Sequence, residues 1–311
     1  MRVKFTIQKY NPEKDITPHF RDYFVEVGRR STVLDALIRL KTEQDGTLTL
    51  RYSCRAAICG SCAMEINGAE KLACKVQVRE ELERHGRIQI GPLKNMPVIK
   101  DLIVDMNPFW QQVREVIPWL ETPSNGENIS IPKETMATFH NADACIMCGA
   151  CVAACTSREV SPGFLGPAAL AKAYRFANDT RDQAKTSRLQ ALMESDGIWD
   201  CCRCNYCVEV CPKDVKPMEQ IIRLRRMALQ TGLKQEIGAR HITSFVEIVK
   251  REGKLNEGMM PLLMTWPQPK RLLRILPLGI RMFLKRKVPL PFKRPIPGIQ
   301  QLRGLFQQRG K

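Results

Sequence analysis

Residues 145–155 read Cys-Ile-Met-Cys-Gly-Ala-Cys-Val-Ala-Ala-Cys, and residues 201–211 read Cys-Cys-Arg-Cys-Asn-Tyr-Cys-Val-Glu-Val-Cys. Each run contains the spacing C-x2-C-x2-C-x3-C, and Pro212 follows the second run. In this spacing three cysteines of a run hold one 4Fe-4S cube and the fourth reaches across to the other cube. The two runs therefore predict two cubes within one domain. Zinc, the alternative, usually needs only four ligands, taken as two separated pairs.

A third cysteine group lies upstream, where Cys54-x4-Cys59-x2-Cys62 is followed by Cys74 after eleven intervening residues. This is the spacing of plant-type 2Fe-2S ferredoxins. The ligand loop must wrap the cluster closely, and Gly60 with the small residues around it lets backbone N–H groups approach the sulfurs. Such hydrogen bonds raise the reduction potential of a cluster.

The bulk properties limit the class of protein. With 311 residues, the chain is long enough for two or three domains. Its net charge of +17 suggests an anionic partner, namely a membrane surface, an acidic protein or nucleic acid. The cysteines sit in tight clusters, which favours metal ligation in a reducing compartment over secreted disulfides. The N-terminus has no apolar signal core, and no stretch approaches the ~18 apolar residues of a membrane span.

The N-terminal domain, expected over residues 1–105, has the pattern of a small mixed α/β fold. Alternating apolar residues and turn signals predict strand, strand, helix and then further strands, which matches a β-grasp sheet with a helix packed on one face. The expected elements are a strand at 3–7, a strand at 23–27, a capped helix at 32–40, a hairpin around Asn67-Gly68 and a last strand at 88–90.

The rest of the chain divides into three parts. Prolines and a Ser-Asn-Gly sequence predict a linker over 106–135. Residues 136–235 are expected to be all-α and to bury both cysteine runs, with helices at 166–176 and 218–229. Residues 236–311 form a basic amphipathic extension.

This extension has no acidic residue after Glu257, and basic and apolar residues alternate densely between Lys270 and Arg294. Seven prolines between residues 267 and 297 are expected to prevent one long helix. Such a segment commonly lies on an anionic membrane or docks on an acidic partner. A solvated basic tail is the alternative. Nucleic-acid binding is disfavoured because no stacking aromatic residues accompany the charge.

Taken together, these motifs resemble the iron–sulfur subunit of succinate dehydrogenase/fumarate reductase over about residues 1–235. The resemblance is carried by Ser53-Cys-Arg-Ala-Ala-Ile-Cys-Gly-Ser-Cys-Ala-Met64, Val104-Asp-Met-x-x-Phe109, Gly166-Pro-Ala-Ala-Leu170 and the two cysteine runs, in this order. It implies a subunit without catalytic residues of its own. Such a subunit relays electrons between FAD in a flavoprotein subunit and a quinone site in membrane-associated subunits of a succinate:quinone oxidoreductase or quinol:fumarate reductase.

The resemblance also implies the ligands of one 2Fe-2S cluster, nearest the flavin, and of two cubes, one in the middle and one on the quinone side. The implied sets are Cys54, Cys59, Cys62 and Cys74 for 2Fe-2S, Cys145, Cys148, Cys151 and Cys211 for the middle 4Fe-4S, and Cys155, Cys201, Cys204 and Cys207 for the terminal 4Fe-4S.

The chain departs from the common family pattern at informative positions. The commonest members lack a cysteine at the position of Cys204, and their last cluster is 3Fe-4S. Three further departures fall in the family's quinone pocket: Thr156 replaces a proline, Val160 a tryptophan and Cys202 a histidine. Cys202 is the thirteenth cysteine, without a ligand role. We expect it to be a small buried residue beside the cube, and a redox or relay role is the alternative.

The segments Lys270–Arg274 and Leu278–Arg281 resemble, more weakly, the C-terminal segment of one of the subunits of heterodisulfide reductase. This implies a non-classical branch of the family, in which a cysteine-rich protein of heterodisulfide-reductase type replaces the haem-bearing anchor. The expected location is peripheral, on the cytoplasmic side of the cell membrane. The alternative function is the iron–sulfur subunit of a thiol-linked fumarate reductase.

Overall fold

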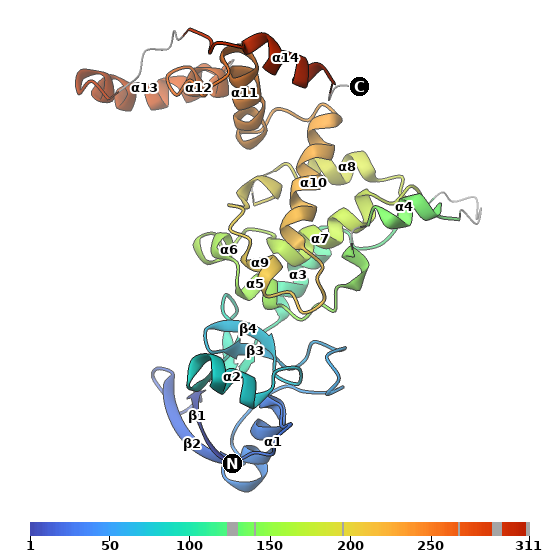
Figure 1. Ribbon diagram of the computed structural model, residues 1–311, viewed down its shortest axis with the longest axis vertical. Helices are drawn as coiled ribbons and strands as arrows, with labels where there is room; N and C mark the ends of the chain where they lie inside the picture. The colour runs from blue at the N-terminus through green and yellow to red at the C-terminus, as the bar shows by residue number, and fades with distance from the viewer. Residues whose placement is uncertain (123–129, 140, 195, 267, 288–293, 309–311) are drawn as a thin grey trace. The chain divides into compact units, whose positions relative to one another are not determined.

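The computed structural model describes residues 1–311 except 123–129, 140, 195, 267, 288–293 and 309–311 (Figure 1). The chain forms two compact units, Met1–Arg226 and Met227–Lys311. Within the described ranges, none of the helices combines the length and the apolar character needed to cross a bilayer.

The first unit begins with a mixed five-stranded sheet. Its strand order is β2 (His19–Glu26), β1 (Arg2–Lys9), β5 (Ile88–Gly91), β3 (Ala63–Ile66) and β4 (Ala69–Leu72). Strand β1 pairs antiparallel with β2 and parallel with β5, and β3 pairs antiparallel with both β4 and β5. The predicted strands and the hairpin are confirmed. The expectation that the strand at 88–90 is the last one is wrong, because two short strands follow and pair with each other. The strands are β1 (Arg2–Lys9), β2 (His19–Glu26), β3 (Ala63–Ile66), β4 (Ala69–Leu72), β5 (Ile88–Gly91), β6 (Val98–Lys100) and β7 (Ile103–Val104).

Helix α1 (Val33–Glu43) begins with the predicted capping box. The backbone N–H of Asp35 donates to the Thr32 hydroxyl at 3.1 Å, and the backbone N–H of Thr32 donates to the Asp35 carboxylate at 2.9 Å. The apolar side of α1 joins the core beneath the sheet, where Leu37 and Phe5 are fully buried. A second helix, α2 (Val78–His85), was not expected from the sequence.

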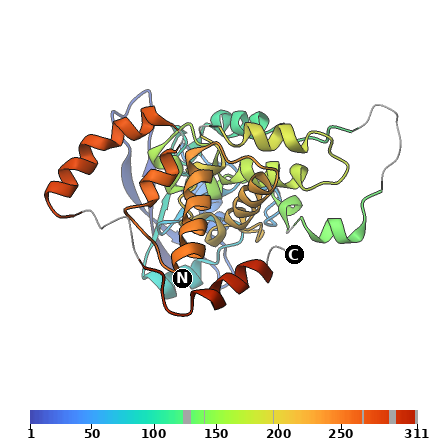
Figure 2. The same cartoon turned by 90° about the horizontal axis from the view of Figure 1, so that it is seen from above.

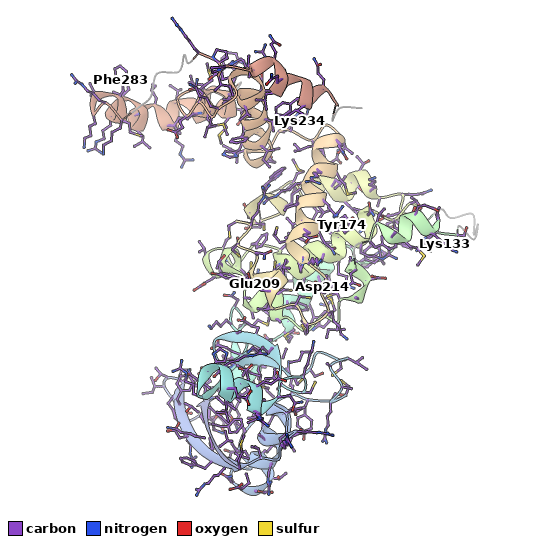
Figure 3. All side chains as sticks on the ribbon, viewed as in Figure 1. Lys133, Tyr174, Glu209, Asp214, Lys234 and Phe283 are labelled. Carbon is purple, nitrogen blue, oxygen red and sulfur yellow. The ribbon has the colours of Figure 1, made fainter. Side chains whose placement is uncertain are left out.

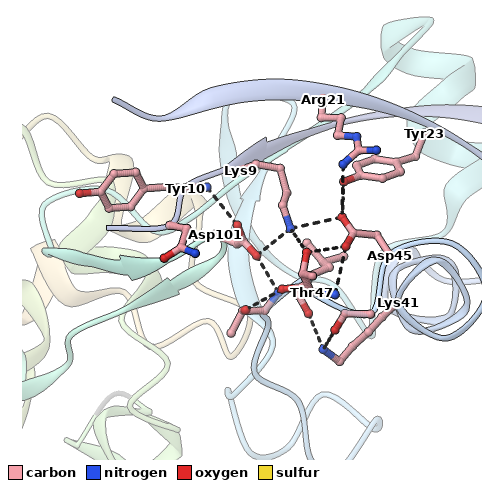
Figure 4. Close-up of polar contacts among 12 residues, drawn as sticks. Lys9, Tyr10, Arg21, Tyr23, Lys41, Asp45, Thr47 and Asp101 are labelled. Atoms are coloured by element: carbon pink, nitrogen blue, oxygen red, sulfur yellow. Dashed lines mark hydrogen bonds and ion pairs between the residues drawn. The ribbon is translucent and has the colours of Figure 1, made fainter. Parts of the chain in front are cut away.

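A buried polar cluster ties β1 to segments that follow it much later in the chain (Figure 4). The Lys9 ammonium lies 3.0 Å from the Asp101 carboxylate and 3.3 Å from the Asp45 carboxylate. The Tyr23 hydroxyl donates to Asp45 at 2.5 Å, and the backbone N–H of Thr47 donates to Asp45 at 3.0 Å. Burial alone would raise the pKa of Asp45, but hydrogen bonds from Thr47 and Tyr23 and the charge of Lys9 hold it below its usual value.

The helical part of the first unit follows the sheet. Helix α3 (Asn107–Glu115) lies within the stretch expected to be a linker and packs against α7 (Gly166–Ala177). Residues 123–129 of that stretch lie outside the described residues. The helices predicted at 166–176 and 218–229 are confirmed as α7 and α10. The elements are α3 (Asn107–Glu115), α4 (Lys133–Ala137), η1 (Ala142–Ala144), α5 (Ala150–Ala153), α6 (Thr156–Val160), α7 (Gly166–Ala177), α8 (Lys185–Ala191), η2 (Ile198–Asp200), α9 (Tyr206–Glu209) and α10 (Pro217–Gln230).

The second unit contains α11 (Ile237–Glu252), α12 (Met260–Thr265), α13 (Pro269–Leu284) and α14 (Ile299–Gln308), seen from two directions in Figures 1 and 2. Helix α11 ends at Gly253 in the left-handed conformation, and Arg303 of α14 donates to the backbone carbonyl of Arg251 at 3.0 Å. The chain is broken into separate helices as expected, but Pro277 lies inside α13. Residues 288–293 of the basic segment lie outside the described residues.

We predict that Lys9→Met lowers the free energy of unfolding by about 3–5 kcal/mol, because it removes the buried cation of Asp101 and leaves Asp45 with only the exposed Arg21, 4.0 Å away. Lys4 on the same strand is the matched control: it pairs with Asp22 at 2.9 Å, and both side chains are about half exposed. Lys4→Met should cost less than about 1 kcal/mol. Anaerobic urea unfolding followed by circular dichroism measures both, and equal losses in the two variants would contradict the role of the cluster.

Candidate metal centres

The loop from Cys54 to Cys62 turns its backbone N–H groups towards cysteine sulfur. Arg55 and Ala57 have φ of +54° and Gly60 has φ of +75°, so the chain reverses direction repeatedly over a few residues. The Cys54 sulfur accepts three backbone N–H bonds, from Ala56 at 3.4 Å, Ile58 at 3.4 Å and Cys59 at 3.3 Å. Such donors stabilise a thiolate and a cluster bound to it.

The remaining cysteines of this group come from the sheet. Cys62 immediately precedes β3 and Cys74 follows β4, and the Cys74 sulfur accepts the Ala57 N–H at 3.3 Å. Burial raises the pKa of the Cys62 thiol to about 12, whereas a hydrogen bond with the Ser61 hydroxyl lowers the pKa of Cys59 to about 6. Cys54 and Cys59 are exposed and Cys62 is buried. The candidate 2Fe-2S site therefore has one side against the sheet and one side at the surface.

The two cysteine runs adopt the same local structure twice. In each run a 3-10 helix precedes the first cysteine. Residues with positive φ flank the second cysteine of the C-x2-C-x2-C-x3-C spacing, which is Cys148 in the first run and Cys204 in the second. Met147 and Gly149 take these positions around Cys148. A one-turn helix then carries the third cysteine, and the fourth cysteine follows two residues after its end. The equivalent residues of the second run are Arg203 and Asn205 around Cys204.

Two cavities lie beside these loops, and each draws cysteines from both runs. The first is lined by Cys145, Cys148 and Cys151 of the first run and by Cys211 of the second. The second cavity is lined by Cys155, the last cysteine of the first run, and by the cysteines of the second run other than Cys211. These are Cys201, Cys202, Cys204 and Cys207. The structure thus brings together the same sets of four cysteines that the family resemblance implies as ligands, with Cys202 beside the second set.

Both cavities have the character that an iron–sulfur cube requires. Apart from the sulfurs, their walls are largely apolar, with Val215 and Ala168 at the first and Phe164 and Ile221 at the second. The backbone N–H of Val215 donates to the Cys211 sulfur at 3.3 Å. Among the described residues, no group of three or more histidine, cysteine, aspartate or glutamate side chains is arranged so that it could hold a single metal ion.

Burial raises the pKa of several of the cysteine thiols that line the cavities. It raises the pKa of Cys148 and of Cys155 to about 11 and that of Cys207 to about 12. A ligand thiol must lose its proton to bind iron, so binding of a metal cluster here releases protons.

Cys202 differs from the expectation. It is exposed rather than buried. Its backbone N–H donates to the Ser157 hydroxyl at 3.1 Å, and its sulfur lies 3.3 Å from the Thr156 hydroxyl. Thr156 and Cys202, two of the positions singled out in the sequence, are therefore in contact with each other.

Buried arginines support the second cavity, and the sequence interpretation missed them. Arg225 of α10 donates to the backbone carbonyls of Ile198 at 2.7 Å and Cys201 at 2.8 Å, and it lies over the Trp199 ring. Burial lowers its pKa from the usual arginine value. The available signal was its position four residues after Ile221, on the apolar side of the predicted helix.

Arg158 supports the same cavity from α6. It is buried beside Cys155 and donates to the Phe164 carbonyl at 2.7 Å. The two guanidinium groups place positive charge near two different cysteines of the second cavity, Arg158 near Cys155 and Arg225 near Cys201.

Asn95 joins the sheet domain to the helical part. Its side-chain amide lies within hydrogen-bond distance of three backbone carbonyls at the end of α5, those of Val152 at 3.1 Å, Ala153 at 2.9 Å and Cys155 at 3.0 Å. It therefore fixes the backbone that carries Cys155. An asparagine before Met-Pro gives no signal of this role in the sequence.

Comparison with known proteins agrees with this geometry. Residues 4–111 match a family model described as a 2Fe-2S iron–sulfur cluster binding domain, and residues 141–215 match a 4Fe-4S dicluster domain. The chain is therefore an iron–sulfur protein with both kinds of cluster-binding domain.

Curated relatives define the family more narrowly. The chain is 39% identical over 223 residues to the fumarate reductase iron–sulfur subunit of Escherichia coli O6:H1, covering 70% of this chain and 90% of that protein. It is 39% identical over 239 residues to the corresponding protein of Mycobacterium tuberculosis, covering 75% and 96%. It is 38% identical over 228 residues to the succinate dehydrogenase iron–sulfur subunit of Paracoccus denitrificans, covering 72% and 87%.

Among solved structures, a chain of the "Mycobacterium smegmatis Sdh1 complex in the apo form" matches with a TM-score of 0.65 and 26% identity, covering 74% of this chain and 97% of that one. The protein belongs to the family of iron–sulfur subunits of succinate dehydrogenase and fumarate reductase.

We predict that Arg225→Met destabilises the first unit by about 1–3 kcal/mol for each carbonyl left without a donor. The exposed neighbour Arg226 provides the control, and Arg226→Met should stay within about 0.5 kcal/mol of the wild type. Anaerobic urea unfolding measures both variants. A loss in Arg226→Met as large as that in Arg225→Met would contradict the assigned role of Arg225.

Proposed function

We propose that the protein is the electron-transfer subunit of a succinate:quinone oxidoreductase or quinol:fumarate reductase. It would relay electrons between FAD in a flavoprotein subunit and a quinone site in membrane-associated subunits. The observation that carries this proposal is the arrangement of twelve cysteines, four in the loop and at the strand ends of the sheet domain and eight around two cavities. Iron–sulfur clusters accept and donate single electrons when bound at such sites.

In this proposal the protein's own residues hold the clusters and control their surroundings. The loop N–H groups stabilise the thiolate of Cys54, apolar walls exclude water from the cavities, and Arg158 and Arg225 supply positive charge to the second cavity. The exposed loop around Cys54 and Cys59 offers the side of the 2Fe-2S site through which electrons would pass to or from a flavoprotein.

We assign one 2Fe-2S cluster to Cys54, Cys59, Cys62 and Cys74, a middle 4Fe-4S cluster to Cys145, Cys148, Cys151 and Cys211, and a terminal 4Fe-4S cluster to Cys155, Cys201, Cys204 and Cys207. Cys204 lining the second cavity supports a complete cube there. The corresponding division is a β-grasp 2Fe-2S domain over 1–105, a linker over 106–135, a helical two-cluster domain over 136–235 and a docking extension over 236–311. The strand order of the sheet supports the β-grasp assignment.

We further propose that the protein represents the non-classical branch, with a cysteine-rich, heterodisulfide-reductase-like anchor protein and a peripheral position on the cytoplasmic side of the membrane. Helix α13 supports docking, because large apolar side chains are exposed along its length, among them Leu273 at 65% and Leu284 at 77%. Figure 3 shows Phe283, itself 65% exposed, near the end of this helix among basic side chains. The described part of the helix carries basic residues and no acidic ones.

The cluster assignment predicts about ten irons per chain and no 3Fe-4S signal in the intact oxidised protein. Cys204→Ser should introduce that EPR signal and remove about one iron, because three thiolates remain at the terminal cube. Cys202→Ser, at a neighbouring cysteine without a ligand role, should retain about ten irons. A strong 3Fe-4S signal in the wild type, or a colourless zinc protein, would refute the assignment.

The docking role predicts that Leu273→Asp combined with Leu284→Asp releases the assembled complex from the membrane fraction. Both side chains are exposed, so the substitutions should leave folding intact. Leu305→Asp on α14, at a position that is 60% exposed, is the control and should leave the complex in the membrane fraction. Retention of the double variant in that fraction would argue against docking through α13.

A further inference from the structure

Gly60 lies where the 2Fe-2S loop meets the first cysteine run. A Cβ atom at this position would lie 2.7 Å from the Cys148 Cβ, 3.0 Å from the Cys148 Cα and 3.2 Å from the Ile146 carbonyl oxygen. Two of these three atoms belong to the backbone and the third is attached directly to it, so no flexible side-chain end can move aside. Only glycine fits this contact without separating the two loops.

The contact is fixed from both directions. Ile146 and Cys148 pack against the apolar core of the sheet domain. Behind them, a Cβ on Gly149 would lie 3.0 Å from the Met96 methyl group and 3.5 Å from a Leu93 methyl group. The cysteine run is thus held between the sheet core and the segment after β5, so a side chain at position 60 has to push the loops apart.

We propose that Gly60 is a positioning residue for electron transfer, because its missing side chain sets the closest approach of the 2Fe-2S loop to the loop of the middle cube. This inference rests on the proposed function, in which Cys59 and Cys148 hold different clusters. The step moves one electron, which oxidises the reduced 2Fe-2S centre and reduces the cube, and no bond forms or breaks. The rate of this electron transfer falls steeply as the separation of the two centres increases. By keeping that separation short, the Gly60 contact would keep the transfer fast.

The test compares Gly60→Ala with Gly86→Ala in the anaerobically purified full-length holoprotein. Gly86 ends α2 with φ of +67°, close to the +75° of Gly60, but a Cβ there meets nothing within 4 Å. Both variants therefore carry a similar backbone penalty, and only Gly60→Ala has the steric conflict. Iron and sulfide content confirms that the clusters are present in each.

The readout is the microwave power that half-saturates the EPR signal of the reduced 2Fe-2S cluster. A rapidly relaxing cube nearby raises this power, and the effect decreases steeply with distance. We expect a lower half-saturation power in Gly60→Ala and the wild-type value in Gly86→Ala. Wild-type relaxation in a fully loaded Gly60→Ala protein would overturn the inference and leave the proposed function intact. Absence of 2Fe-2S or 4Fe-4S signals from the wild type would refute the proposed function itself.

A second variant covers the case in which Gly60→Ala fails to assemble its clusters. Asn95→Ala removes the bonds to Val152, Ala153 and Cys155 across the same junction without touching the 2Fe-2S loop. Loosening this junction should also lower the half-saturation power. An unchanged value in a loaded Asn95→Ala protein, with Gly60→Ala unassembled, would overturn the inference.

Discussion

The last cysteine of each run lines the cavity formed mainly by the other run, and the fold of the helical part of the first unit depends on this exchange. Cys155 and Cys211 follow their one-turn helices and line the opposite cavities. Burial holds thiols such as Cys155 in their protonated form, so cluster binding has to displace protons from the interior. Neither cavity can be completed by one run alone, and folding of this region is therefore expected to depend on both runs and on the metal.

Side chains far away in the sequence hold the crossing segments in place. Arg225 fixes the loop before Cys201 from α10, and Asn95 fixes the backbone near Cys155 from the sheet domain. Replacing either group with an apolar one would leave main-chain carbonyls unsatisfied, which is costly in a buried position. The cysteine spacing thus indicates which cysteines line each cavity, while buried polar side chains hold the loops that carry them.

Local patterns explain which features could be predicted from the sequence. The Thr32 capping box, the Asn67-Gly68 hairpin and the cysteine spacings each act over a few residues, and the structure contains the corresponding helix, hairpin and loops. Contacts between distant residues leave much less local signal. Arg225 could be noticed only as a charged residue on the apolar side of a predicted helix, and the sequence around Asn95 gave no signal of its role. Pro277 was expected to interrupt a helix, but it lies within α13, where the surrounding leucines and arginines favour the helical state. Cys202 was expected to be buried but is exposed, and its contacts are with residues 45 and 46 positions earlier in the chain, which the local sequence could not indicate.

The most direct test is an anaerobic density map of the iron-loaded protein that resolves the sulfur–iron bonds. The account predicts that the Cys211 sulfur binds the same four-iron cluster as Cys145, Cys148 and Cys151, and that Cys155 binds the four-iron cluster of Cys201, Cys204 and Cys207. A map in which each run holds a cluster with its own four cysteines, or in which Cys204 binds no iron, would contradict it.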